Sequence, residues 1–281
     1  MLLKLDTTTF HLSPSQCRGS EDVNLVQLTD CHLFARSDGK LLGLETESSL
    51  RAVIEDIQQN TDFDFVLATG DLSQDASEAS YQRMSQFLDL LKKPAFWTPG
   101  NHDCPQQMQN SIQGKNLFHH KRIITQYWQV ILLDSSVRGK VHGFLTQDAL
   151  DFLHNALNDK AELNTLLVLH HQPVQIGSAW LDNIGLKNNA EFMAVLALHS
   201  QVKGILWGHI HQEYQQNLSN MKLMSTPSTC VQFEPGSQDF EAGSQSPGYR
   251  RLCLKADGSI ETEVIRIESQ PFVVDYSIRG Y

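Results

Sequence analysis

The chain has 281 residues, of which 41% are hydrophobic, and a net charge of −10 from 22 basic and 32 acidic residues. That hydrophobic content suffices for a buried core and excludes a largely disordered chain. Since no basic run is present, a nucleic-acid polymer is not an expected partner. No stretch has the length and apolarity of a signal peptide or a membrane span, and the five cysteines show no metal-finger spacing. We therefore expect a cytoplasmic protein without a membrane partner, either a monomer or a homodimer.

The chain is predicted to start with a polar arm, residues 1–22, followed by one domain over residues 23–281. Amphipathic helices are predicted from apolar residues at i, i+3, i+4 and i+7 at about 46–59, at about 77–92, after Thr146 and after Asn188, the last one reaching His199. Between these helices, short apolar runs have the character of buried strands. The alternation of strands with helices predicts βαβ units and an α/β fold.

After His211 the pattern changes from alternating helices and strands to strands alone. Strands are predicted at 221–226, 249–254 and 260–267, with a Gly/Ser/Pro-rich loop at 234–248. Asp257-Gly258 is typical of a hairpin turn between the last two strands. Residues 221–281 are therefore expected to complete the sheets of the same domain.

Polar fragments directly follow the apolar runs NLVQLT, FDFVLAT, PAFWTP, TLLVL and KGILW. They are Asp30-Cys31-His32, Gly70-Asp71, Gly100-Asn101-His102-Asp103, His170-His171 and Gly208-His209-Ile210-His211. Side chains at the carboxyl ends of successive strands converge in an α/β fold. We expect Asp30 and His32 to share one side of an extended strand end, because side chains alternate with period two. Carboxylate, imidazole and amide donors suit Mn, Fe, Co or Zn, and the set is large enough for two ions. The sequence thus predicts a dinuclear metal hydrolase.

These fragments resemble, in order and spacing, the five-block signature of the calcineurin-like metallophosphoesterases over about residues 23–212. Segments outside the signature, including 178–182 and 226–233, resemble the bacterial class III 3′,5′-cyclic AMP phosphodiesterases within that family. The resemblance implies a four-layer α/β/β/α sandwich of two facing mixed sheets. It also implies hydrolysis of cyclic AMP to 5′-AMP. Two rivals stay open, another small-molecule phosphodiesterase or phosphatase on this scaffold and a binding scaffold without catalysis.

By the same resemblance, two divalent ions are expected, Fe or Mn in the first place and Zn or Co as alternatives. One ion would be held by Asp30, His32, Asp71 and His211, and the other by Asp71, Asn101, His170 and His209. Asp71 would bridge the ions, and His102 would act as a catalytic acid without binding metal. Asp103 is expected to fix the tautomer of His102. The residues expected to contact the substrate are His32, Asp71, Asn101, His102 and His211.

Several other residues near these motifs are expected to have supporting roles. His171 is predicted to pack beside the ligands, His119-His120 to lie on the surface without partners, and Asp134 to support a loop. Cys31 is predicted to face away from the ligands. Trp180, Leu181 and Asp182, through the resemblance, are candidates for the pocket mouth.

Overall fold

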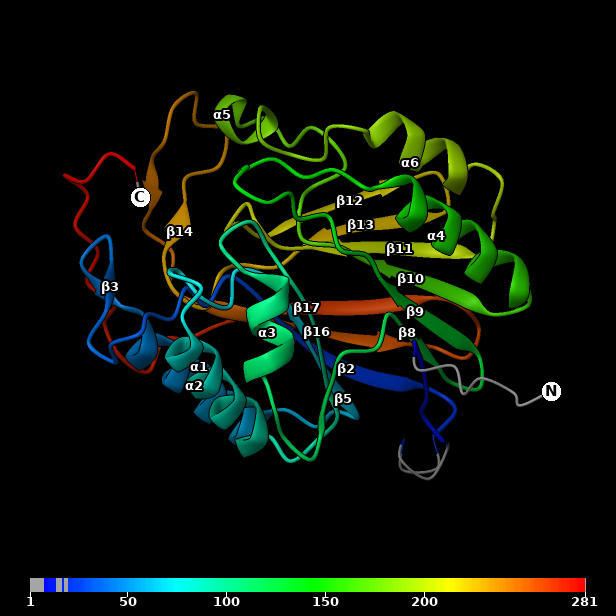
Figure 1. Cartoon of the computed structure of the whole chain (residues 1–281), viewed down its shortest axis with the longest axis horizontal. Coiled ribbons are helices and arrows are strands. Elements are labelled where there is room, and N and C mark those ends of the chain that lie inside the picture. The colour runs from blue at the N-terminus through cyan, green and yellow to red at the C-terminus, as the bar shows by residue number, and fades with distance from the viewer. Residues whose placement is uncertain (1–7, 14–16, 18–19, 281) are drawn as a thin grey trace.

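Two facing sheets with helices on their outer sides form the four layers of the computed structural model, which describes residues 8–13, 17 and 20–280 (Figure 1). Sheet A contains, in spatial order, β1 (Thr9–His11), β8 (Arg122–Ile124), β9 (Trp128–Leu132), β10 (Asn164–Val168), β11 (Val202–Trp207), β13 (Met221–Ser225) and β12 (Tyr214–Leu218). Sheet B contains β17 (Ile260–Arg266), β16 (Gly248–Leu254), β2 (Val23–Leu28), β5 (Phe65–Thr69), β6 (Ala95–Thr98) and β7 (Leu117–Phe118). Two small pairs join β3 (Lys40–Leu41) to β4 (Leu44–Glu45) and β14 (Gln232–Phe233) to β15 (Ala242–Gly243). Both large sheets are mixed, as predicted.

The helices cover the outer faces of the two sheets (Figure 1). They are α1 (Thr46–Asn60), α2 (Glu78–Leu90) and α3 (Pro105–Ser111) on sheet B, and α4 (Gln147–Asp159) and α6 (Asn189–Leu196) on sheet A. The short α5 (Ala179–Asp182) instead packs through Leu181 beside Phe233. α2 and α4 begin at hydroxyl residues whose side chains accept the backbone N–H three residues on, Ser77 from Ser80 and Thr146 from Ala149. These caps explain why both helices start where the sequence predicts.

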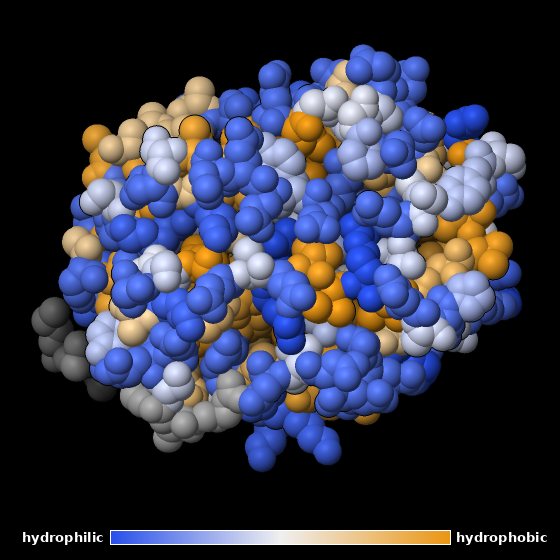
Figure 2. Space-filling view, turned by 180° about the vertical axis from the view of Figure 1, so that it is seen from behind, coloured by the Kyte–Doolittle hydropathy of each residue, from blue (hydrophilic) through white to orange (hydrophobic). Residues whose placement is uncertain are grey.

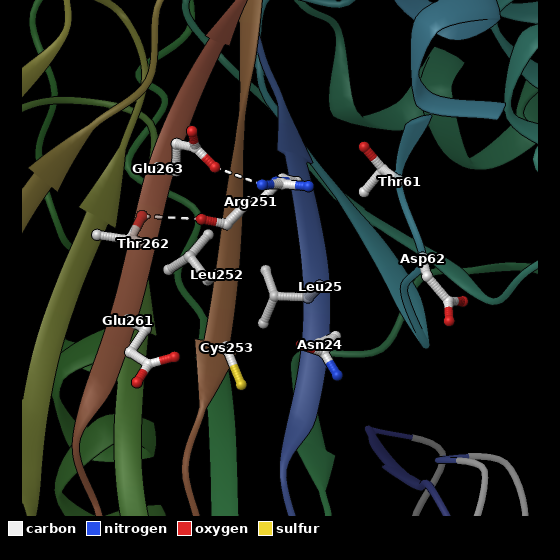
Figure 3. Close-up of a pocket in the computed structure, with 10 residues that line it drawn as sticks. All are labelled: Asn24, Leu25, Thr61, Asp62, Arg251, Leu252, Cys253, Glu261, Thr262 and Glu263. Carbon is white, nitrogen blue, oxygen red and sulfur yellow. Dashed lines mark hydrogen bonds and ion pairs between the residues drawn. The ribbon is translucent and has the colours of Figure 1, made fainter. Parts of the chain in front are cut away.

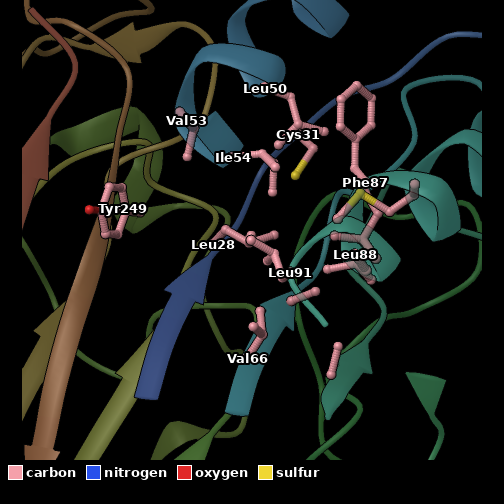
Figure 4. Close-up of a cluster of buried hydrophobic side chains, with 14 of the residues drawn as sticks. Leu28, Cys31, Leu50, Val53, Ile54, Val66, Phe87, Leu88, Leu91 and Tyr249 are labelled. Carbon is pink, nitrogen blue, oxygen red and sulfur yellow. The ribbon is translucent and has the colours of Figure 1, made fainter. Parts of the chain in front are cut away.

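Period-two alternation along the strands divides the apolar residues into three layers of core. In β5, for example, Val66 and Ala68 pack outward against α1 and α2, whereas Phe65 and Leu67 point toward sheet A. Figure 4 shows the outer cluster, in which side chains of β2 and β5 meet those of α1 and α2. A third cluster joins the outer face of sheet A to α4 and α6. Three apolar layers between four layers of structure confirm the predicted α/β/β/α sandwich.

Most predicted elements lie within a few residues of the observed ones, and the differences have simple causes. α6 ends at Leu196, so the prediction that this helix reaches His199 was wrong. α3 was not predicted, since only Met108 and Ser111 of its residues are buried and no apolar stripe marks it. Part of the predicted polar arm, Thr9–His11, forms β1 and pairs with β8. The strand β12 was missed because its exposed sequence, YQQNL, carries no apolar pattern.

The carboxyl-terminal strands join the two sheets already described. β13 adds to sheet A beside β11, and the β16–β17 hairpin adds to sheet B beside β2. Gly258 adopts φ 88° in the turn of this hairpin, as the Asp-Gly signal predicts. The predicted loop 234–248 also contains β15, which pairs with β14.

The outer surface has no large continuous apolar patch on the face shown in Figure 2, where hydrophilic residues surround small separate apolar areas. Among the described residues, no helix combines the length and the apolarity needed to cross a membrane. The strands β2, β5, β6, β9, β10 and β11 all deliver their polar fragments to one end of the sandwich, because they run parallel within each sheet. That end carries the candidate site.

Candidate metal centre

The structure brings the candidate ligands together in one buried cluster at the carboxyl ends of strands from both sheets. Ligand atoms within 4.8 Å of one another form groups that include Asp30 with His32 and His211, Asp30 with Asp71 and His170, and His170 with His171 and His209. Asn101 lies in the loop that packs on Asp71, where a Cβ at Gly100 would come within 2.2 Å of Asp71 Oδ1. Only glycine fits at position 100, because any side chain there would displace the carboxylate of Asp71.

Five of the candidate ligands have a left-handed backbone conformation, which the sequence did not predict. They have φ between 46° and 66° and are Asp30, His32, Asp71, His209 and His211. The expectation that Asp30 and His32 project from an extended strand end was therefore wrong, since β2 stops at Leu28 and both residues follow in a tight loop. Non-glycine residues in this region are uncommon and strained by about 1 kcal/mol or more each. Such strain at functional residues persists only where the surrounding structure imposes it.

The first half of the cluster is compact. His32 Nε2 lies 3.1 Å from His211 Nε2, and His211 Nε2 lies 3.3 Å from Asp30 Oδ1. Asp71 Oδ2 is 3.9 Å from His32 Nε2 and 3.2 Å from His170 Nε2, which places this carboxylate between the two halves. A carboxylate in that position has the geometry expected of a bridging ligand.

The opposite ring nitrogens of three histidines are fixed by backbone or amide oxygens. His170 Nδ1 donates to Thr69 O at 2.8 Å, and His211 Nδ1 donates to Val231 O at 2.7 Å. His32 Nδ1 lies 2.6 Å from Gln74 Oε1 and donates to it in the same way. Each Nε2 is thereby turned into the cluster. This arrangement is the usual one around metal-binding histidines.

The electrostatics of the cluster favour ionised carboxylates. Burial raises the pKa of Asp71, but the charges of His170 and His102 outweigh it and hold this pKa well below its usual range. Burial lowers the pKa of His170, yet the carboxylates of Asp71 and Asp30 raise it to about 9. Burial lowers the pKa of His32 to about 3. A bound cation would balance the two carboxylates in place of the proton that His170 holds.

The second half contains buried polar atoms that have no hydrogen-bond partner. Among the described residues these include Asn101 Oδ1, His170 Nε2 and His209 Nε2. A buried acceptor without a partner costs about 1–3 kcal/mol, so such atoms need an explanation. All three belong to the predicted ligand set of one ion, and the amide oxygen and imidazole nitrogens suit a divalent transition metal. The residues present therefore fit a metal ion at this position.

His102 lies at the edge of the cluster and is only half-buried. Its ring centroid is 5.0 Å from that of His32, and its backbone N–H donates to Asp71 Oδ1 at 2.8 Å. A ring nitrogen of His102 is within 4.8 Å of ligand atoms of both His32 and Asp71. The imidazole is thus close enough to act on a molecule bound at the cluster.

Asp103 has a different role from the predicted one. Its Oδ2 accepts hydrogen bonds from the backbone N–H groups of Gly100 and Leu72. Its Oδ1 accepts hydrogen bonds from the backbone N–H of Ser73 and from the hydroxyl of Tyr81. Burial raises the pKa of this carboxyl group to about 6. Asp103 therefore ties the loop after β6 to the loop after β5, and the expectation that it fixes the tautomer of the preceding histidine was wrong.

His171 lies close to the candidate ligands, but both of its ring nitrogens have other partners. Nε2 donates to Val141 O at 3.0 Å, so Nδ1 accepts the Ser135 hydroxyl at 2.8 Å. Burial lowers the pKa of His171 to about 3, which keeps the ring neutral. As predicted, His171 packs beside the ligands, because neither nitrogen is left for a metal.

Other residues flagged in the sequence lie outside the cluster. Asp134 accepts from the backbone and hydroxyl of Ser136 and supports a loop, as expected. Cys31 is fully buried in the core of sheet B, also as expected. The expectation that His119 and His120 lack partners was wrong, since His119 stacks on Trp97 and His120 packs near Phe10.

The segment Trp180–Asp182 lies in α5 (Figure 1). Leu181 is fully buried, and Asp182 accepts the backbone N–H groups of Ile176 and Gly177. Trp180 packs edge-on against Phe233 at 5.1 Å between ring centroids. Phe233 in turn stacks on His211 at 4.2 Å. Aromatic contacts therefore connect Trp180 to a candidate ligand.

Residues 23–213 match the family described as calcineurin-like phosphoesterase, and the chain belongs to that family. This family uses a dinuclear metal site, and the cluster above contains His and Asp groups able to bind metal.

Within this family, the chain is similar over most of its length to curated proteins with a more specific description. The chain is 44% identical to the 3′,5′-cyclic adenosine monophosphate phosphodiesterase CpdA of Pseudomonas aeruginosa, over 92% of this chain and 95% of the relative. It is 42% identical to the protein of the same name from Vibrio vulnificus, over 95% of this chain and 98% of the relative. Among solved structures, a dimetal phosphatase from Danio rerio superposes with a TM-score of 0.58 at 15% identity, over 88% of this chain and 99% of that one. The last likeness supports the fold alone.

Proposed function

We propose that the protein hydrolyses 3′,5′-cyclic AMP to 5′-AMP with two divalent metal ions. The observation that carries the proposal is the convergence of buried ligand atoms from both sheets, several of them without any other partner. The proposed substrate is the one named in the descriptions of two relatives, which are 42–44% identical to the chain over almost its whole length. Both lines of support are independent of the fold likeness.

In this proposal, Asp30, His32, Asp71 and His211 hold one ion, and Asp71, Asn101, His170 and His209 hold the other. Fe and Mn are the proposed metals, with Zn and Co as alternatives, because the donors are oxygen and imidazole nitrogen without thiolate. When bound, two such ions would act as Lewis acids on phosphate oxygens and lower the pKa of water.

The remaining chemistry falls to side chains at the rim of the cluster. Phosphorus would gain the hydroxyl group of a water, whose other proton would pass to solvent, and lose its bond to the 3′-oxygen of the ribose. His102 would give an imidazole proton to that 3′-oxygen as the bond breaks, which positions it as the general acid. Asp71 would hold His102 in place through its hydrogen bond to the His102 backbone N–H. The substrate-contacting set would be His32, Asp71, Asn101, His102 and His211.

A substrate panel with the Mn²⁺-loaded protein tests this function. The expected result is conversion of 3′,5′-cyclic AMP to 5′-AMP, with little hydrolysis of 5′-AMP or duplex DNA. Faster hydrolysis of a phosphomonoester than of any cyclic nucleotide would contradict the substrate while leaving the family unchanged.

We also propose a reducing compartment, the cytoplasm, for this protein. All five cysteines are free thiols in the structure, and three of them are buried: Cys17, Cys31 and Cys230. Disulfides are rare in reducing compartments. Thiol titration of freshly isolated, denatured protein should give five free thiols, and an intact disulfide would contradict the proposal.

A further inference from the structure

Each half of the candidate metal centre takes ligands from both sheets. Asp30, His32 and Asp71 follow strands of sheet B, whereas His170, His209 and His211 follow strands of sheet A. No strand pairing joins the two sheets along the described residues. The distance between the sheets at this end therefore determines whether ligand atoms from the two sheets meet. Hydrogen bonds between paired strands do not set this distance.

Among the side chains that cross between the sheets, that of Gln27 lies directly beneath the ligand loops. Gln27 lies on β2, is fully buried, and shares the inward face of the strand with Leu25. Its Nε2 donates to Thr69 Oγ1 at 2.7 Å within sheet B and to Trp207 O at 3.1 Å in sheet A. Its Oε1 accepts the hydroxyl of Thr226, which follows the last residue of β13 in sheet A. The amide thus joins both sheets and has every hydrogen bond satisfied.

The partners of Gln27 lead into the ligand loops. Thr69 comes two residues before Asp71, and its carbonyl oxygen accepts His170 Nδ1 at 2.8 Å. Trp207 comes two residues before His209. Gln27 itself is three residues before Asp30, the first residue of the first ligand motif. A displacement of this amide would therefore shift loops that carry ligands of both ions.

The chemical nature of Gln27 contrasts with that of most of its surroundings. Most of the layer between the sheets is an apolar cluster that includes Leu25, Leu67, Leu206 and Met224. The exception beside Gln27 is Arg250 on β16, which is also buried and donates to Ser225 O of sheet A at 2.6 Å. A buried amide in such a layer contributes little net stability, because its hydrogen bonds only offset the loss of water. Buried polar networks do, however, select one arrangement among several that an apolar contact would tolerate.

We propose that Gln27 is a positioning residue that fixes the separation of the two sheets at the metal-binding end, so that ligands from both sheets reach the same pair of cations. This inference rests on the proposed two-metal function. It concerns the geometry of the pair and assigns Gln27 no contact with metal or substrate.

The test compares Gln27→Met with the wild-type protein after chelation and reloading with Mn²⁺. Methionine keeps the length and the burial of the side chain and removes its hydrogen bonds. We expect Mn²⁺ affinity, measured by calorimetric titration, to fall about 10- to 100-fold, as it does when groups supporting metal ligands are removed. We also expect the electron paramagnetic resonance signal of an exchange-coupled manganese pair to be lost.

Two further sets of variants separate positioning from general destabilisation. Gln129→Met is the matched control, because Gln129 is equally buried but bonds to Arg122, Thr165 and Lys160 without reaching sheet B. It should lower the melting temperature of the metal-free protein and keep the coupled signal. Thr226→Val removes only the hydroxyl that reaches Gln27, and Thr226→Ser keeps it. We expect a loss of Mn²⁺ affinity with valine and wild-type affinity with serine.

The outcomes distinguish failure of this inference from failure of the proposed function. If the wild-type protein binds no pair of Mn²⁺ ions, the two-metal function is wrong and the inference with it. If the wild-type protein binds the pair and Gln27→Met binds it with equal affinity and coupling, only the inference is wrong. An equal loss in Gln129→Met would also overturn it. Should Gln27→Met fail to fold, equal behaviour of Thr226→Val and Thr226→Ser would overturn it.

Discussion

The two ends of sheet B treat polar side chains in opposite ways. At the amino ends of β2 and β5, a groove of about 440 Å³ lies over β16 and β17, lined mostly by polar and charged residues (Figure 3). There Arg251 pairs with Glu263, and both side chains are largely exposed, at 41% and 59%. At the carboxyl ends, by contrast, the polar atoms of the candidate ligands are buried and several have no hydrogen-bond partner.

A concave surface alone therefore does not mark the functional site. The groove is open, and its charged groups are solvated or paired, so nothing there requires a ligand. At the carboxyl ends of these strands, the backbone is strained and several buried polar atoms have no hydrogen-bond partner. Both features cost free energy, which the binding of a ligand can offset.

Asp71→Ala should have the largest effect, because Asp71 lies between the two halves of the cluster. We expect loss of both metal ions, measured by elemental analysis, and loss of cyclic AMP hydrolysis. Addition of Mn²⁺ at 100 times its dissociation constant should stabilise the wild-type protein by about 2.7 kcal/mol but not the variant. An Asp71→Ala protein with a full metal content would show that this carboxylate is not a bridge.

His102→Ala should separate chemistry from metal binding. The rate should fall roughly 10²- to 10⁴-fold, the usual contribution of a positioned acid, while the metal content stays at the wild-type level. Single-turnover kinetics together with elemental analysis measure both quantities. If the variant instead lost its metals, His102 would be a ligand, and the assigned proton transfer would be wrong.

Gly100→Ala should disturb the site through sterics alone. The added Cβ would lie 2.2 Å from Asp71 Oδ1 and 2.5 Å from its backbone nitrogen, so the loop must move. We expect a drop in Mn²⁺ affinity smaller than that of Asp71→Ala, measured by calorimetric titration. Gly139→Ala is a control for backbone strain without a clash, since its φ is 71° and nothing lies within 4 Å of its Cβ position. Wild-type affinity in Gly100→Ala would mean that the loop adapts freely.

Trp180→Ala should have a moderate effect, through the aromatic contacts that connect it to His211. Aromatic pairs contribute about 0.5–1.5 kcal/mol each, so we expect up to roughly a tenfold loss of cyclic AMP turnover. Turnover of a small chromogenic phosphodiester should fall less, because it lacks the nucleoside. Trp180→Phe keeps an aromatic ring and should retain most of the activity. Equal losses on both substrates would argue against a role of Trp180 in selectivity.

Glu263→Ala, in the groove of Figure 3, should change little. Exposed ion pairs contribute about 0–1 kcal/mol, so stability should stay within about 0.5 kcal/mol of the wild type and activity should be unchanged. Chemical denaturation and the cyclic AMP assay measure both. A large loss of activity would show that this end of sheet B takes part in function after all.

The alternation of strands and helices was predictable from the sequence because the central strands are buried on both faces, whereas the four layers followed from the family resemblance. Runs such as TLLVL and KGILW specify strands through apolar content alone, and the capping residues Ser77 and Thr146 mark helix starts. Edge elements were missed for the same physical reason. β12 and α3 bury few apolar residues, so no periodic pattern announces them.

The members of the candidate site were likewise predictable, but their geometry was not. Ligand-type residues after successive strands indicate convergence, whereas the left-handed conformation of Asp30 and His32 depends on loops packed by distant residues. The partners of Asp103 come from three separate segments, and sequence proximity suggested the wrong one. Gln27 was overlooked because a lone glutamine in an apolar strand has no motif. An inward-facing polar residue three positions before the Asp-x-His motif was the available signal.

The strained backbone at Asp30, His32, Asp71, His209 and His211 has a consequence for the evolution of this scaffold. Glycine adopts left-handed φ without strain, so replacing Asp30 by glycine should relax the loop of the metal-free chain while removing a ligand. Selection for activity and selection for stability therefore act in opposite directions at these positions. In a descendant that no longer needs catalysis, we expect glycine or asparagine to replace these residues first. Loss of function would therefore change the residues with left-handed φ before it changed the core.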